Sequence, residues 1–426
     1  MFSNPLLDAL AGKGVVSAGE LRQRLDVSPA TLSRLSAQAG DAVVRIGRGR
    51  KSSYTRVRPL ALLPTRILVF RVDADGEPQA AATWTPLDRG ATWVTRQGDA
   101  EPDGHLHAGL PPVAHDMAPA GYLGRYFAEH HLHLGLPARL QDWSDDHRLV
   151  AIARRGEDTA GDLIVGEESL QRFLDGVPTE VTEDDYPRIA EATVHGASTS
   201  SPAGEQPKLT AYIGGRHMLA KFTSGDGSAS DLRWRDLLVC EALALEILAR
   251  GGLAASSARI VDVGTRRFLE IERFDRIGAR GRVGVIALGP IDDDVAGGQD
   301  SWGRAAKRLR ALALLSEDDS LRVQRLEAFA ILIANSDRHF GNIAFFADGL
   351  DASPQLRLAP AYDMLPMMFA PRAGVLPQVA RPAVTPRAEL LDVWKEAAAL
   401  ASEYWAAISA DSRVSEEFRA SVSGSN

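Results

Sequence analysis

The sequence predicts an α+β protein of two or three domains. Its 426 residues exceed what one hydrophobic core usually organises, and a hydrophobic content of 45% is ample for burial. Strand-like pairs around glycine turns occur together with long apolar helical segments. Charge is unevenly distributed: residues 1–58 carry ten Lys and Arg against four acids, in a chain of net charge −8. We therefore expect a small basic module joined to a large acidic body.

Composition excludes several classes of protein. The net charge argues against a chain that is basic over its whole surface for nucleic-acid or membrane binding. The single cysteine, Cys240, excludes a disulfide framework and a Cys-rich zinc or iron–sulfur site. No uncharged apolar run of about 18 residues occurs, and the first 14 residues lack the basic flank and apolar stretch of a secretory signal. We expect a cytoplasmic protein with no membrane partner.

Residues 1–58 predict three short helices followed by a strand hairpin. Leu6, Leu7 and Leu10 share one helical face, and residues 17–20 (Ser-Ala-Gly-Glu) form a capping box for a second helix. Ser28 and Pro29 supply an N-cap and a first-turn proline for the third helix.

Two short apolar strands, residues 42–46 and 53–57, then flank a basic tip at residues 47–51. This order of helices and strands is typical of a winged helix-turn-helix domain.

The charge of this module predicts DNA binding. Six basic residues lie between Arg45 and Arg58 with no acid among them, and phosphate contacts need such charge. A recognition helix reads bases from its N-terminal residues. The residues predicted to contact DNA are Ser28, Thr31 and Arg34 on the helix and Arg48, Arg50 and Lys51 on the hairpin. The alternative is a helical subdomain with a solvated basic loop.

Pro59 and Pro64 indicate a boundary, after which strand-like runs and turns give way to helices. From about residue 191 the pattern changes. The segment contains a Ser/Thr/Gly-rich stretch, a hairpin, a long helix and a second hairpin; their expected bounds are 196–204, 208–213 with 217–222, 231–249, and 258–263 with 266–274. These are the parts of a kinase small lobe.

The most informative stretch runs from Asn335 to Asn342 (Asn-Ser-Asp-Arg-His-Phe-Gly-Asn) between an apolar helix and a strand. Phosphoryl transfer needs a carboxylate that accepts a hydroxyl proton and oxygen ligands for a metal. Asp337 and Asn342 have the spacing of a protein-kinase catalytic loop. The β-ribbon that follows can return Asp363 beside Asn342, where both would hold magnesium. Loop capping is the alternative for any one of these residues alone.

Five motifs in one order resemble the HipA family of serine/threonine kinase toxins. They are Ser201-Pro-Ala-Gly-Glu-Gln-Pro-Lys208, the strand lysine Lys221, Glu272-Arg-Phe-Asp-Arg276, Asn335 to Asn342, and Leu358-Ala-Pro-Ala-Tyr-Asp363. The amino-terminal module resembles that of the YjjJ (HipH) branch. The resemblance implies a HipA-like bilobed protein-kinase-like fold. The expected domains are the winged helix-turn-helix (1–58), a HipA-like N-terminal subdomain (66–190), small-lobe elements (191–275) and a mainly helical large lobe (276–426).

The same resemblance implies roles for individual residues. Asp337 is expected to be the catalytic base, and Asn342 with Asp363 the ligands of Mg²⁺. Lys221 would contact ATP phosphates. The other residues expected to bind ATP are Ser201, Ala203, Gly204, Glu205, Gln206 and Lys208 in the phosphate loop, Glu272 and Phe274 beside the adenine, and His339 near the nucleotide.

Two assignments keep alternatives. Ser201 lies at the family's autophosphorylation position, and Ser198, Thr199 and Ser200 are other acceptors in the same loop. A carboxylate on the helix at 231–249 should pair with Lys221. Glu241 is our choice, and the others are Asp236 and Glu246.

The resulting hypothesis is a toxin of a type II toxin–antitoxin system that uses ATP and Mg²⁺ to phosphorylate a protein. The family implies a translation component, such as an aminoacyl-tRNA synthetase, as the substrate, and an antitoxin as a further partner. One alternative is a DNA-binding transcriptional regulator whose kinase-like body senses nucleotide. Another is a nuclease toxin that damages DNA with a metal held by the same acids.

Overall fold

The computed structural model describes residues 4–100, 103–195, 206–295, 297–298, 300–347 and 355–423. The chain divides into two compact units, each considered by itself. The first comprises Met1–Asp73, Glu77–Pro119 and His131–Val177, and the second comprises Ala74–Gly76, Ala120–His130 and Pro178–Asn426.

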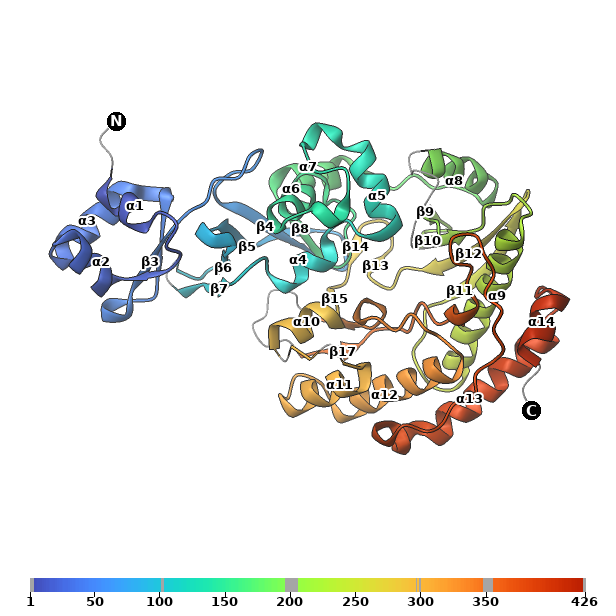
Figure 1. Cartoon of the computed structure of the whole chain (residues 1–426). Helices are drawn as coiled ribbons and strands as arrows, with labels where there is room; N and C mark the ends of the chain where they lie inside the picture. The colour runs from blue at the N-terminus through green and yellow to red at the C-terminus, as the bar shows by residue number, and fades with distance from the viewer. Residues whose placement is uncertain are drawn as a thin grey trace. The chain divides into compact units, whose positions relative to one another are not determined.

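The first unit begins with three helices and a small sheet (Figure 1). The helices are α1 (Pro5–Leu10), α2 (Ala18–Leu25) and α3 (Pro29–Ala39), and the strands β1 (Val16–Ser17), β2 (Val43–Ile46) and β3 (Ser53–Arg56) pair in the order β1-β3-β2. Ser17 and Ser28 cap α2 and α3, each accepting a hydrogen bond from the backbone N–H three residues later. The helices and the hairpin lie where the sequence predicts them, and the short strand β1 is an addition.

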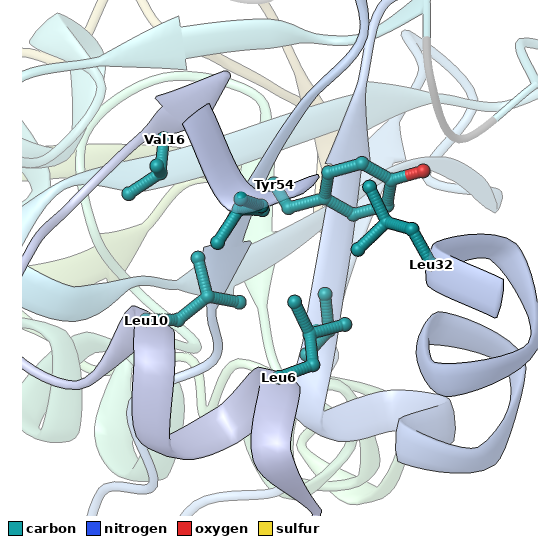
Figure 2. Packing of buried hydrophobic residues seen from close by; sticks show 7 residues of the cluster. Leu6, Leu10, Val16, Leu32 and Tyr54 are labelled. Carbon is teal, nitrogen blue, oxygen red and sulfur yellow. The ribbon is translucent and has the colours of Figure 1, made fainter. Parts of the chain in front are cut away.

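A compact apolar cluster holds this module together. Leu6 and Leu10 of α1 point toward Val16, Leu32 and Tyr54, and all five are buried (Figure 2). The predicted apolar face of the first helix is thus its core face.

A five-stranded antiparallel sheet forms the rest of the first unit, in the order β7-β6-β5-β4-β8. The strands are β4 (Ile67–Val72), β5 (Pro78–Pro86), β6 (Thr92–Arg96), β7 (His105–His107) and β8 (Leu163–Val165), accompanied by α4 (Pro112–Met117), α6 (Asp145–Arg155) and α7 (Glu167–Asp175).

The amino-terminal module shares a core with this sheet. Val44 and Val57 from its strand region pack with Leu87 and Trp93 in a buried cluster. The N–H of Arg58 also donates to the carbonyl of Pro86 at 2.9 Å. Residues 1–58 are therefore packed against the sheet that follows them in the chain.

The second unit contains a four-stranded antiparallel sheet in the order β11-β12-β10-β9. Its strands are β9 (Lys208–Ile213), β10 (Arg216–Phe222), β11 (Ala258–Val263) and β12 (Arg266–Glu272), and the long helix α9 (Ala229–Arg250) connects β10 to β11. The two predicted hairpins and the helix between them are confirmed. The last strand ends at Glu272, two residues earlier than expected.

The remaining elements are mainly helical. They comprise α5 (Gly121–His130), α8 (Tyr186–His195), the pair β13 (Arg276–Ile277) and β14 (Gly281–Arg282), α10 (Leu288–Val295), α11 (Trp302–Ala311), α12 (Glu317–Leu332), α13 (Leu391–Ala410) and α14 (Glu416–Ser423). A small sheet joins β15 (Val285–Ala287), β16 (Ala344–Phe346) and β17 (Arg357–Leu358). Helix α13 packs against α12 and α9. Within the described residues, none of the helices is long and apolar enough to cross a membrane.

Candidate active site

A buried lysine lies at the centre of the second unit. The Nζ of Lys221 on β10 donates to both carboxylate oxygens of Glu241 on α9, each at 2.7 Å. The side chain of Lys221 is 7% exposed and that of Glu241 is fully buried. Lys221 also contacts Oδ1 of Asp363, which follows β17. Glu241 is thus the partner of Lys221, as we expected among the three acids of the helix.

Burial and the neighbouring charges shift the pKa values of Lys221, Glu241 and Asp363 in opposite directions. Burial alone would lower the pKa of Lys221, but the carboxylates of Asp363 and Glu241 hold the pKa above its ordinary value. Burial raises the pKa of Glu241, and the lysine offsets part of this effect. Burial would likewise raise the pKa of Asp363, but the positive charges of Lys221 and Lys208 bring it below its ordinary value. Asp363 is therefore ionised at neutral pH, as a metal ligand must be.

Asn335 holds the loop after α12 in place. It is fully buried, and its Nδ2 donates to the carbonyl of Asp363 at 3.1 Å. Its Oδ1 accepts from the N–H of Asp337 at 2.9 Å. One amide therefore fixes the backbone of both the predicted base, Asp337, and the predicted metal ligand, Asp363. The sequence motif alone assigns Asn335 no role; a buried asparagine after an apolar helix is the signal that could have identified it.

The Nδ2 of Asn342 donates to the carbonyl of Asp337 at 2.8 Å. Its Oδ1 accepts no hydrogen bond from the described residues, and this leaves an oxygen for a cation. The carboxylate of Asp337 is exposed, and among the described residues it has no hydrogen-bonding partner. Its backbone is anchored at both the N–H and the carbonyl while its side chain faces solvent. This geometry suits a general base that would accept the proton of a substrate hydroxyl.

The predicted β-ribbon is present: Phe345 pairs with Leu358, and Phe346 pairs with Arg357. The chain returns through it to Asp363, whose backbone is left-handed at φ 53°. A non-glycine residue in this region is strained, and such strain recurs at functional sites. Through Asn335, the ribbon brings Asp363 into one network with Asp337 and Asn342.

The other nucleotide-binding candidates lie in several environments. Glu272 pairs with Arg216 at 3.1 Å. Arg276, in the same motif, pairs with Asp275 at 2.7 Å.

Phe274 lies 5.9 Å from the rings of both Phe346 and Tyr362. His339 is exposed, and its Nδ1 accepts from the N–H of Gly341 at 3.1 Å.

The phosphate-loop candidates are only partly visible. Gln206 donates to the carbonyl of Phe222, and Lys208 lies opposite Lys221 across the β9 and β10 pair. The remaining candidates, Ser201, Ala203, Gly204 and Glu205, lie outside the described residues, as do the alternative acceptors Ser198, Thr199 and Ser200.

A divalent cation fits the donor set that is present. The oxygens of Asp363 and Asn342 are of the hard type that Mg²⁺ prefers, and magnesium usually keeps waters and substrate phosphates as its other ligands. In the described part of the chain, no group of three or more His, Cys, Asp or Glu could hold a metal by itself. The residues thus match a cation that is shared with a nucleotide.

In the amino-terminal module, Ser28, Arg34, Arg50 and Lys51 are exposed. Arg34 donates to the hydroxyl of Thr31 at 3.3 Å. Two of the six basic residues between 45 and 58 have acidic partners from elsewhere in the first unit: Arg48 pairs with Asp103, and Arg58 pairs with Asp146. The expectation of wholly uncompensated charge is therefore wrong for these two.

Two family models match this chain. The YjjJ-like toxin, middle domain, matches residues 63–174, and the HipA-like C-terminal domain matches residues 200–420. The chain is 35% identical over 424 residues to Toxin YjjJ of Escherichia coli (strain K12), an alignment that covers 96% of this chain and 93% of the relative.

Two solved structures show weaker likeness. One is a chain from the Shewanella oneidensis MR-1 complex of HipA, HipB and its operator DNA, with a TM-score of 0.49 and 16% identity over 80% of this chain and 90% of that chain. The other is the Helicobacter pylori proinflammatory kinase CtkA, with a TM-score of 0.27 and 15% identity over 37% of this chain and 54% of that chain. At these TM-scores and identities, neither structure is evidence for the function of this chain.

The buried ion pair gives a prediction for stability. Lys221→Met leaves the carboxylate of Glu241 buried without its partner, which should lower the free energy of unfolding by about 3–5 kcal/mol. Adding Glu241→Gln should restore part of the loss. Denaturant unfolding of the full chain, followed for wild type, Lys221→Met, Glu241→Gln and the double variant, measures this double-mutant cycle.

The same variant should respond to pH. Without Lys221 the pKa of Glu241 rises further, so the folded state binds a proton that the unfolded state does not. The stability deficit of Lys221→Met relative to wild type should therefore shrink as pH falls from about 8 to about 5. In the double variant with Glu241→Gln, the deficit that remains should not change with pH over this range. A deficit independent of pH in the single variant contradicts the assignment.

Proposed function

Because this chain belongs to the HipA-like family of toxins, we propose that it is an ATP- and Mg²⁺-dependent serine/threonine protein kinase. The observation that carries the proposal is the network in which Asn335 and Asn342 bind the backbone of Asp337, while Asp363 contacts the buried Lys221. The proposed base, the two proposed metal ligands and the lysine proposed to contact phosphate are thus connected within the second unit.

Each residue has a distinct task in this proposal. Asp337 accepts the proton of the attacking hydroxyl, since its carboxylate is exposed while its backbone is fixed. Lys221, oriented by Glu241, directs its ammonium at phosphate oxygens. Asp363 and the Oδ1 of Asn342 would hold Mg²⁺. When bound, Mg²⁺ and ATP supply charge neutralisation and the phosphoryl group.

The protein substrate is proposed from the family alone. A translation component, such as an aminoacyl-tRNA synthetase, is the class that the resemblance implies, and an antitoxin is the proposed partner. In the Shewanella oneidensis complex, HipA is found together with HipB and operator DNA.

The second candidate function is DNA binding by residues 1–58. It is favoured by a capped helix α3 with Arg34 exposed, followed by a hairpin tip at which Arg50 and Lys51 are exposed. We propose that these elements form a winged helix-turn-helix. A DNA-bound regulator and a kinase can coexist in one chain. The nuclease alternative has no specific observation in its favour.

Asp337→Ala should abolish ATP-dependent phosphate incorporation and growth inhibition while leaving the fold intact. Loss of general base catalysis costs typically 10²–10⁴-fold in rate, as an order of magnitude. Asp318→Ala is a matched control, because Asp318 is an acid at the start of α12 with a side chain 81% exposed. Radiolabel incorporation by Asp337→Ala equal to that of the control would refute the kinase assignment.

Autophosphorylation should occur at Ser201. A phosphate there adds nearly two negative charges to the loop that is expected to hold ATP phosphates, so it should silence the enzyme. Phosphopeptide mapping after incubation with ATP should find the group within residues 198–201. Ser201→Ala should remove it from that peptide and prolong activity toward an added substrate. No phosphate within the four residues would sink this hypothesis.

DNA binding should depend on the exposed charges that have no acidic partner among the described residues. Replacing Arg50 and Lys51 together by Gln should weaken binding and lower the salt dependence by about one counterion for each lost phosphate contact. Arg24→Gln is the control, because Arg24 is paired with Glu20 on α2 at 2.9 Å. Fluorescence anisotropy with duplex DNA over a salt series measures both quantities. An unchanged salt slope in the double variant contradicts the predicted wing contacts.

A further inference from the structure

A cavity of about 230 Å³ lies in the second unit, between the start of α9 and the segment that joins α13 to α14. None of the residues proposed to act in phosphoryl transfer lines it. Four arginines contribute to its wall: Arg233 and Arg235 on α9, Arg267 on β12, and Arg413 before α14. Clustered guanidinium groups in a concave site are a means of recognising phosphate and carboxylate.

Three of these arginines are fixed by neighbouring acceptors. Arg267 binds Asp262 through Nε and Nη2 at 2.9 and 2.8 Å, and it donates to the carbonyl of Arg413 at 2.9 Å.

Arg413 binds Asp411. Arg235 donates to the carbonyl of Thr265 at 3.1 Å and to Asp262 at 3.3 Å. The wall is thus held in place before any ligand arrives, which reduces the entropy lost on binding.

Arg233 is the least satisfied member. Its side chain is 7% exposed and lies 4.9 Å from the ring centroid of Phe418. Of its five N–H groups, one donates a hydrogen bond within the described residues, to the carbonyl of Phe369 at 3.3 Å. Its nearest carboxylate, Glu417, is 3.7 Å away and 80% exposed. A buried guanidinium with spare donors favours an acceptor that is supplied from outside.

Nearby acids engage three of the four arginines: Asp262 pairs with Arg235 and Arg267, and Asp411 pairs with Arg413. The wall holds Asp236 and Glu417 against the four arginines. Both oxygens of Asp236 already accept from Ser415, from its N–H at 2.7 Å and its hydroxyl at 2.6 Å. Arg233, which among the described carboxylates only the exposed Glu417 approaches, is therefore the guanidinium of the wall whose charge is least compensated.

We propose that this cavity binds an oxyanion of the phosphate class, either a small phosphate compound or a phosphorylated side chain. The volume exceeds that of a bare phosphate, and Leu232 and Leu376 in the wall leave room for an attached apolar group. The site is separate from the proposed nucleotide site, so binding does not depend on kinase activity. A ligand there would also fix the first turns of α9, the helix that carries Glu241.

The test uses the full chain with inorganic phosphate and with O-phosphoserine, at constant ionic strength set by chloride. Isothermal titration calorimetry and thermal unfolding should show saturable binding and stabilisation of the folded state. Arg235→Gln should weaken binding about tenfold or more, the typical effect of losing one charge-assisted hydrogen bond. Tighter binding of O-phosphoserine would assign an organic part to the ligand, whereas equal affinity would assign the bare phosphate group.

Two controls locate the site. Arg250→Gln changes an exposed arginine at the other end of α9 and should leave binding unchanged. Lys208→Gln, at the predicted phosphate loop, should also leave it unchanged. Arg233 is buried, so the binding measured for Arg233→Gln is interpreted only if circular dichroism shows a wild-type fold. Arg235 is partly exposed, and Arg235→Gln is therefore the main test variant. Absence of saturable binding, or equal affinity in wild type and Arg235→Gln, overturns the proposal.

Discussion

The second unit depends on burying one ammonium group. Moving a charge out of water costs several kcal/mol, and attraction in the interior offsets that cost only with close geometry and satisfied hydrogen bonds. Lys221 meets this condition through both oxygens of Glu241 and through Asp363, which is 142 residues further along the chain. The sheet, the long helix and the returning β-ribbon must therefore all be in place before the lysine is satisfied. The requirement couples the proposed catalytic geometry to folding.

Asn335 extends this coupling to the loop that carries the proposed base. Its amide binds one backbone atom of Asp363 and one of Asp337, so a shift of either acid costs a buried hydrogen bond. The carboxylate of Asp337 remains available for chemistry because the constraint acts on its backbone, whereas one carboxylate oxygen of Asp363 contacts Lys221. Positioning and reactivity are thus assigned to different residues, as a preorganised site requires.

Local pattern predicted the elements well, and contacts between distant residues were harder to predict. Strands β9 and β11 have their expected bounds, because glycine turns and apolar alternation are local signals. From the sequence, Glu241 could be identified only as one of three acids on one helix that could pair with Lys221. In the structure, Asp236 binds Ser415 and Glu246 contacts Arg250, so each alternative has another partner. The pairing of Arg48 with Asp103 and the role of Asn335 arise from tertiary packing, for which the sequence carries no periodic signal.

Net charge summed over a chain segment therefore does not describe the charge at a local site in either unit. In the amino-terminal module, acids from outside residues 1–58 pair with Arg48 and Arg58. Of the basic residues predicted to contact DNA, Arg34, Arg50 and Lys51 then remain exposed with no acidic partner among the described residues. In the acidic body, four arginines converge on one cavity despite the negative total. An anion responds to the field within about a Debye length, roughly 8–10 Å in physiological salt, and not to the charge of a whole segment. The charge that remains after pairing, rather than segment charge, is thus the quantity that predicts where an anion would bind.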